Sequence, residues 1–298
     1  MLSIRNIVKQ YANHRALDNV SIEVEKGSVF GLLGPNGAGK TSLIRIINQI
    51  TGPDSGEVFI SGERLNPSHI SKIGYLPEER GLYKKMEIGE QMLYLAQLKG
   101  LNKKDATKRI KYWFEKMQIE SWWSKKVEDL SKGMQQKVQF IATVVHDPEL
   151  IILDEPFSGF DPVNAQVITN EILELNNKGA TIIFSTHRME SVEQLCDSIA
   201  LIHKSKKILD GKVRDIKNLY RSHTYRIGFS GQLNGSENEM FTIIEQKYDE
   251  GLTHLTVKVN DKYSANDLLN LFIPQVQVNE FMEVIPSMND IFIQNVKN

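Results

Sequence analysis

The sequence predicts an α/β fold with a buried, largely parallel sheet, followed by a small α+β domain. The runs 28–33, 150–153 and 181–184 are almost continuously apolar, which is typical of parallel strands covered on both faces. Helical patterns bound the last two runs, as expected where strands and helices alternate. Beyond about residue 220 the pattern changes to alternating segments such as 253–259, which predicts a second domain.

The length of the chain also favours two domains. At 298 residues it exceeds the usual size of a single domain, and we assign 1–220 to a large domain and 221–298 to a small accessory domain. Alternating residues at 21–25 predict an antiparallel β subdomain at the start of the large domain. Helical spacing between residues 87 and 119 predicts a helical insertion over about 83–147.

Three local patterns describe the accessory domain. The stretch 231–238 is rich in Gly, Ser and Asn and predicts a loop. Apolar spacing over 266–272 predicts a helix, and another is expected after Ser287. Together with the alternating strands, these helices give the α+β character of this part.

Composition excludes several classes of protein. With 41% hydrophobic and 24% charged residues, the chain has enough apolar material for a packed core. A net charge of -1 leaves no broad basic surface, so we expect no nucleic-acid partner. The single cysteine, Cys196, allows no internal disulfide, and no apolar run is long enough to span a membrane. The first ten residues lack the apolar core of a signal peptide, so we expect a cytoplasmic protein.

A phosphate-binding loop lies between a predicted strand and a predicted helix. Residues 34–41, GPNGAGKT, fit the pattern G-x-x-x-x-G-K-[ST] of a P-loop NTPase, whose glycines let backbone N–H groups converge on phosphate oxygens. We expect Lys40 to reach the β- and γ-phosphates of a nucleoside triphosphate and the Thr41 hydroxyl to ligate Mg²⁺. The expected nucleotide-binding residues of this segment are Gly34, Pro35, Asn36, Gly37, Ala38, Gly39, Lys40, Thr41 and Ser42.

Two adjacent carboxylates follow a second apolar run. The segment 150–156, LIILDEP, delivers Asp154 and Glu155 to the carboxyl edge of the predicted sheet, where ligands of α/β proteins bind. We expect Asp154 to hold Mg²⁺ through water and Glu155 to accept a proton from the water that attacks the γ-phosphate. The alternative, a surface Asp-Glu pair at a strand end, is disfavoured by the phosphate loop upstream.

Two further segments resemble one family of ATPases. Residues 130–136, LSKGMQQ, resemble the signature motif LSGGQ, and 185–187, STH, resemble the switch histidine of the ATP-binding subunits of ABC transporters. The order and spacing of these motifs resemble that family over residues 1–220. Other P-loop NTPases carry no signature motif between their two phosphate-site elements.

The resemblance implies a head-to-tail dimer in which one chain's phosphate loop faces the other chain's signature motif. Ser131 and Gly133 are then implied to contact the partner's γ-phosphate. Lys132 and Met134 depart from the family pattern. Taken alone, this segment is a weak match and is more typical of an ordinary N-cap before a helix.

Other site residues are also implied by the resemblance. His187 is expected to position the γ-phosphate and the attacking water, the alternative being a structural histidine. Asp161 matches the loop that links the two sites of the dimer, the alternative being a turn residue. Tyr11 lies where the family stacks an aromatic ring on adenine, although it is also typical of a strand surface.

The main departure is Glu78, which occupies the position of a family glutamine. A carboxylate there can approach Mg²⁺ through water, but it adds negative charge near the phosphates, so a purely structural role stays open.

Residues 286–296, PSMNDIFIQNV, at the end of the accessory domain resemble the extra domain on ATPases of drug-resistance and sodium exporters. This resemblance implies an ATP-hydrolysing motor subunit of an ABC exporter, held at the cytoplasmic face of the membrane by multi-spanning permease subunits. The second ATP-binding subunit is a copy of this chain or a related chain. Two alternatives remain: a soluble ABC ATPase in a non-transport complex, and a slow regulatory nucleotide-binding module.

Overall fold

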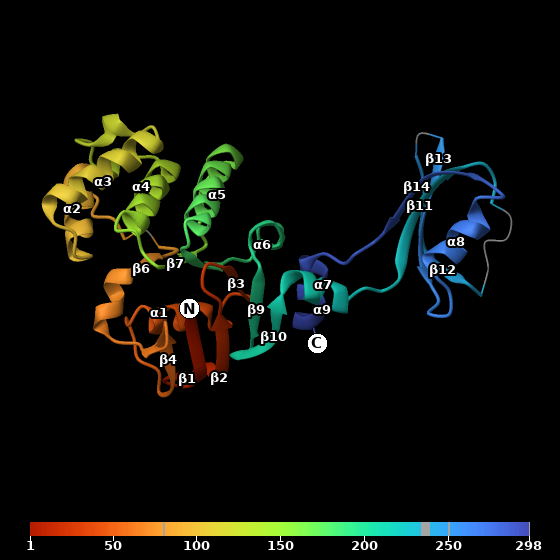
Figure 1. Ribbon diagram of the computed structural model, residues 1–298, viewed down its shortest axis with the longest axis horizontal. Helices are drawn as coiled ribbons and strands as arrows, with labels where there is room; N and C mark the ends of the chain where they lie inside the picture. The colour runs from red at the N-terminus through yellow and green to blue at the C-terminus, as the bar shows by residue number, and fades with distance from the viewer. Residues whose placement is uncertain (80, 234–238, 250, 298) are drawn as a thin grey trace. The chain divides into compact units, whose positions relative to one another are not determined.

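The computed structural model describes residues 1–79, 81–233, 239–249 and 251–297. These residues form two compact units, 1–213 and 214–298 (Figure 1). The boundary that the sequence predicts at residue 220 remains a prediction. Of the predicted loop 231–238, residues 234–238 lie outside the described residues.

A six-stranded, mainly parallel sheet forms the centre of the first unit. In spatial order its strands are β10 (Lys206–Lys212), β9 (Ser198–His203), β3 (Val29–Leu33), β8 (Thr181–Ser185), β7 (Leu150–Asp154) and β6 (Ile73–Leu76). All neighbours pair in parallel except β9 and β10, which form a hairpin. The three apolar runs of the sequence therefore become β3, β7 and β8, which confirms the predicted fold class. Every residue of these three strands is buried.

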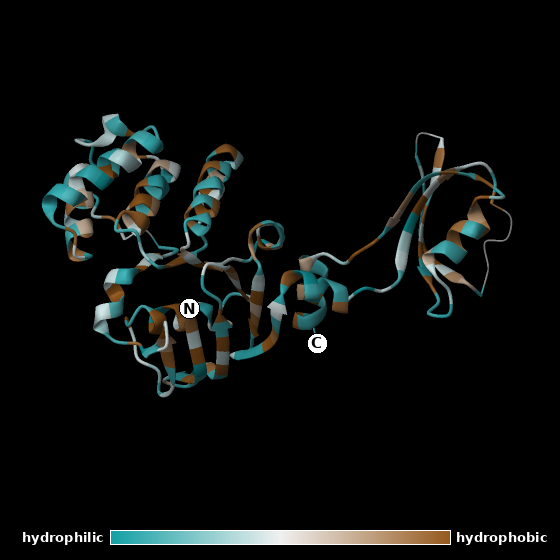
Figure 2. Ribbon diagram, viewed as in Figure 1, coloured by the Kyte–Doolittle hydropathy of each residue, from teal (hydrophilic) through white to brown (hydrophobic). Residues whose placement is uncertain are grey.

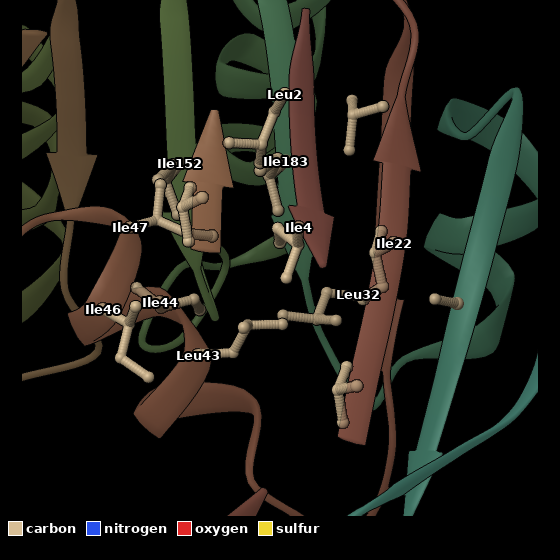
Figure 3. Packing of buried hydrophobic residues seen from close by; sticks show 14 of the residues in the cluster. Leu2, Ile4, Ile22, Leu32, Leu43, Ile44, Ile46, Ile47, Ile152 and Ile183 are labelled. Carbon is tan, nitrogen blue, oxygen red and sulfur yellow. The ribbon is translucent and has the colours of Figure 1, made fainter. Parts of the chain in front are cut away.

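An antiparallel sheet packs against the central sheet across a shared core. Its strands are β2 (His14–Val24), β1 (Leu2–Tyr11), β4 (Ser55–Ile60) and β5 (Glu63–Arg64), in that spatial order. Figure 3 shows Ile4 of β1 and Ile22 of β2 facing Leu32 of β3, with Leu43 of helix α1 (Lys40–Ile47) in the same core. Because α1 is packed into this core, the phosphate loop before it is fixed at both ends.

The helical insertion and the next helix complete the first unit. The helices are α2 (Ile88–Leu98), α3 (Lys103–Lys116), α4 (Lys132–Val144), α5 (Pro162–Asn177) and α6 (Met189–Leu195), with short 3-10 turns at Pro67–Lys72, Glu120–Trp122 and Val127–Asp129. Figure 2 shows hydrophilic (teal) and hydrophobic (brown) residues interspersed along α2 to α5, which is typical of helices packed on one side. No described helix combines the length and hydropathy needed to cross a membrane.

The second unit is built on a four-stranded antiparallel sheet. Its elements are α7 (Val213–Leu219), β11 (Thr224–Ser230), β12 (Phe241–Asp249), β13 (Leu252–Val259), α8 (Ala265–Phe272), β14 (Gln277–Glu283) and α9 (Met288–Lys297). The strands lie in the order β12-β13-β11-β14, and Leu268 and Phe272 of α8 pack on Ile227 and Val257. The Tyr220 hydroxyl donates to Asn295 Oδ1 at 3.1 Å and joins the end of α7 to α9. The predicted α+β character of this part is confirmed.

Candidate active site

The phosphate loop joins β3 to α1 and needs glycine at two close contacts. Gly34 and Gly39 have φ angles of 149° and 116°, in the region that side chains disfavour. A Cβ at Gly34 would lie 2.2 Å from the carbonyl oxygen of Ile202, and one at Gly39 would lie 2.2 Å from that of Ala16. The loop backbone is therefore pressed against β9 on one side and β2 on the other.

The ammonium of Lys40 lies over the phosphate loop. Its Nζ donates to the carbonyl oxygen of Gly34 at 2.6 Å and to that of Pro35 at 3.1 Å. Burial lowers the pKa of Lys40, and the charges of Glu155 and Asp154 oppose this effect. The cation is thus placed among the backbone groups that the sequence assigns to phosphate binding.

Asp154 is the buried end of β7. Burial raises the pKa of its carboxyl, and the negative charges of Glu78 and Glu155 raise it further. Asp154 and Thr41 line the same cavity. Among the residues that the structure describes, no group of three or more acidic, histidine or cysteine side chains is placed to hold a metal. A hydroxyl and a carboxylate fit Mg²⁺, which keeps several water ligands and binds substrate phosphates.

Glu155 is hydrogen-bonded to His187. The backbone N–H of His187 donates to Glu155 Oε1 at 3.0 Å, and the His187 Nδ1 lies 2.7 Å from the same oxygen. Thr186 Oγ1 donates to Oε2 at 3.3 Å. The Glu155 side chain is 14% exposed and that of His187 is 65% exposed, so the contact reaches from the cavity to the surface. Glu155 holds this position with a left-handed backbone, at a φ of 49°.

Lys40, Thr41, Asp154 and Glu155 line one open cavity of about 280 Å³, and His187 lies outside its lining. Its lining residues are Tyr11, His14, Ala16, Asn36, Gly37, Gly39, Lys40, Thr41, Ser42, Glu78, Asp154 and Glu155. Tyr11 is exposed at the end of β1, opposite His14 of β2. The sequence analysis missed His14, although its position across the turn from Tyr11 could have identified it. Pro35 and Ala38 belong to the loop without lining the cavity, and Ala38 is buried beneath it.

Three predicted site residues lie in a second, separate depression. Ser131, Gly133 and Asp161 line a hollow of about 440 Å³ between the starts of α4 and α5. Ser131 Oγ accepts from the N–H of Met134 at 3.3 Å, and Asp161 Oδ1 accepts from that of Asn164 at 2.9 Å. Ser131 therefore caps α4, as the structural alternative for its segment predicts, and Asp161 caps α5, where the alternative was a simple turn residue. Within one chain they do not meet the phosphate loop.

The first cavity, with its glycine loop and paired carboxylates at the carboxyl edge of a parallel sheet, defines a P-loop ATPase. The sequence family described as "ABC transporter" matches residues 17–158. The C-terminal domain of the DrrA1-3-like ATP-binding proteins matches residues 211–296. The chain belongs to the ATP-binding subunits of ABC transporters, and it is an ATPase of that family.

Relatives and solved structures give the same assignment. The ABC transporter ATP-binding protein YhaQ of Bacillus subtilis is 38% identical over 99% of this chain and 98% of its own length. The Nod factor export ATP-binding protein I of Cupriavidus metallidurans is 34% identical over 72% of each chain. A solved ATP-binding subunit of an ABC transporter superposes with a TM-score of 0.69 and 30% identity, over 74% of this chain and 93% of that one.

The packing of the phosphate loop predicts unequal effects of two alanine substitutions. Gly39→Ala and Gly37→Ala both place a side chain at positive φ, which costs about 1–2 kcal/mol in either case. Only Gly39→Ala also drives a methyl group into a backbone oxygen, because nothing lies within 4 Å of a Cβ at Gly37. Thermal unfolding without nucleotide should therefore show a larger fall in Tm for Gly39→Ala. Equal falls would contradict this packing.

Proposed function

We propose that this chain is the ATP-hydrolysing motor subunit of an ABC exporter. The observation that carries the proposal is the contact of Glu155 with His187, at the edge of the cavity that the phosphate loop lines. The names of two relatives support the direction of transport. These are the Nod factor export protein already described and the linearmycin resistance ATP-binding protein LnrL of Bacillus subtilis, which is 35% identical over 72% of this chain.

The cavity supplies the groups that ATP hydrolysis needs. In this proposal the loop N–H groups and Lys40 bind the phosphates, and Tyr11 stacks on the adenine. Glu155 accepts the proton of the attacking water, while His187 orients that water and the γ-phosphate. Thr41 and Asp154 would hold Mg²⁺, with Glu78 in reach through water, and the ion would neutralise phosphate charge.

The second depression supports a site shared between two chains. Ser131 and Gly133 lie at the N-terminus of α4, whose dipole and free N–H groups favour an anion. Since they are separate from the phosphate loop of their own chain, we propose that they face the ATP of a second ATP-binding subunit. Closure of the two chains would then complete each site.

A groove beside the helical insertion suits the membrane partner. It encloses about 350 Å³ and includes Ile50 and Leu98, which are 61% and 65% exposed. It also contains Gln139 Oε1 and His146 Nδ1, which are buried without a hydrogen-bond partner among the residues that the structure describes. Burial lowers the pKa of His146 to about 4, and its Nε2 lies 3.2 Å from the carbonyl oxygen of Ile73, so at neutral pH Nε2 carries the proton and Nδ1 does not. A permease segment with an apolar side chain would fit against Ile50 and Leu98.

The same groove adjoins the ATP cavity. Gln139 Nε2 donates to the carbonyl oxygens of Pro77 and Glu79 at 3.3 Å each, and Glu78 between them lines the cavity. A segment bound to Gln139 would therefore bias the position of Glu78. We propose that this contact couples ATP turnover to the permease, with the chain held as a peripheral protein at the cytoplasmic face of the membrane.

Removal of the base should separate ATP binding from hydrolysis. Glu155→Gln should retain ATP and slow phosphate release by about 10²–10⁴-fold, the usual contribution of a positioned general base. With ATP and Mg²⁺ the variant should also accumulate as a dimer in light scattering. Glu190→Gln, an exposed change on α6, is the matched control and should hydrolyse ATP normally. Undiminished turnover of Glu155→Gln would remove Glu155 from its role.

The shared site predicts a different result for Gly133→Glu. A Cβ at this position meets only ordinary contacts, at 3.7 Å or more, and an acidic residue in the first turn favours the helix. The variant should therefore fold and bind ATP as a monomer. In the Glu155→Gln background it should not form the ATP-dependent dimer, because its carboxylate would face phosphate. If the double variant dimerises at the same ATP concentration as Glu155→Gln alone, Gly133 does not belong to the shared site.

The groove predicts loss of the membrane partner in Leu98→Glu. Because Leu98 is exposed, the variant should fold and keep its basal ATPase rate. Purification of the native complex should no longer recover a multi-spanning protein. Ile244→Glu, an equally exposed apolar position in the second unit, is the control and should keep its partner. Recovery of only ribosomes or DNA with the unaltered chain would overturn the exporter assignment.

A further inference from the structure

An ion-pair cluster joins the helical insertion to α5, outside the ATP cavity and the permease groove. Lys116, at the end of α3, forms an ion pair with Glu171 of α5. Its Nζ also donates a hydrogen bond to Glu174 Oε2 at 2.7 Å. The Lys116 and Glu171 side chains are only 21% and 12% exposed. A partly buried cation between two carboxylates is a stronger link than an ordinary surface pair.

Further contacts fix the cluster in place. The Lys116 ammonium lies 5.3 Å from the ring centre of Trp113, within the range of a cation–π contact. Trp113 in turn packs edge-on against Phe140 of α4 at 6.1 Å. Hydrogen bonds from Lys116 and then Lys178 lower the pKa of Glu174 to about 2, so its carboxylate stays charged at neutral pH. The cluster therefore ties α3 and α4 to α5.

The depression with Ser131 and Asp161 is built from these same two parts of the fold. Ser131 and Gly133 start α4, whereas Asp161 starts α5, and Trp122 lies six residues beyond Lys116 in the chain. One wall of the depression continues into α5, which Lys116 contacts directly, and the other continues into α4, which Lys116 reaches through Trp113 and Phe140. A movement of α3 away from α5 would break the Lys116 bonds and would shift the insertion that carries Ser131 and Gly133.

We propose that Lys116 is a positioning residue for the ATPase reaction. Its bonds to Glu171 and Glu174 keep the signature segment and the Asp161 turn in the arrangement that closes on the ATP of a second chain. This role rests on the shared site of the proposed function. It concerns the alignment of the two walls before closure, and Lys116 itself touches no nucleotide.

The test uses Lys116→Met in the full-length Glu155→Gln chain. The neutral side chain fills similar space and removes both ion pairs. We expect ATP-dependent dimerisation to weaken by about tenfold to 100-fold, the range for hydrogen bonds to a charged group. ATP binding by the monomer should not change. With native Glu155, the KM for ATP should rise by a similar factor while kcat stays within about twofold.

Two variants serve as rescue and control. Lys116→Arg keeps a cation that can bond both carboxylates and should restore most of the dimer affinity. Lys178→Met removes a 2.6 Å pair with Glu174 from a side chain that is 59% exposed, and should leave dimerisation unchanged. If Lys116→Met fails to fold, Glu174→Gln takes its place as the test, because it removes the charge of one of the two acceptors. It should weaken ATP-dependent dimerisation, by less than the factor expected for Lys116→Met.

The outcomes separate this inference from the proposed function. If Glu155→Gln alone does not dimerise with ATP, the shared site fails and Lys116 has no such role. If it dimerises, and Lys116→Met or Glu174→Gln dimerises equally well, the positioning role is wrong while the proposed function stands. Equal weakening by Lys178→Met would also overturn it, because the effect would then be one of general surface charge.

Discussion

The close approach of the phosphate loop to two strands is the constraint on which the rest of the site depends. Gly34 lies against the backbone of β9 and Gly39 against that of β2, at distances that exclude any side chain. Both sheets therefore hold one loop, and α1 behind it is part of their common core. This packing sets the positions of Lys40 and Thr41, and it does so without a bound ligand.

Much of the fold was predictable because its strands are buried on both faces. Their apolar runs gave β3, β7 and β8, and the carboxylates after β7 marked the edge where ligands bind. The contact of Glu155 with His187 joins residues 32 positions apart and follows from the parallel pairing of β7 and β8. The sequence did not predict this contact, although neighbouring parallel strands end at the same edge and so bring the residues after them together.

Other features could not be predicted because they depend on how separate elements pack. Nothing near Lys116 signals its carboxylate partners, which lie more than 50 residues away on α5. Gln139 Oε1 and His146 Nδ1 lack hydrogen-bond partners among the described residues only because of how the surrounding elements pack, which the sequence does not reveal. The signature and Asp161 segments also carry two overlapping signals, since a helix cap and a ligand-facing turn use the same residue types.

The backbone conformation of Glu155 has a consequence for which residue is favoured at this position. Its left-handed conformation, at a φ of 49°, suits glycine or asparagine better than glutamate. The proposed role of Glu155 as general base needs a carboxylate at this position, whereas the backbone conformation favours a different residue. Stability and the proposed catalytic function therefore make opposite demands on residue 155.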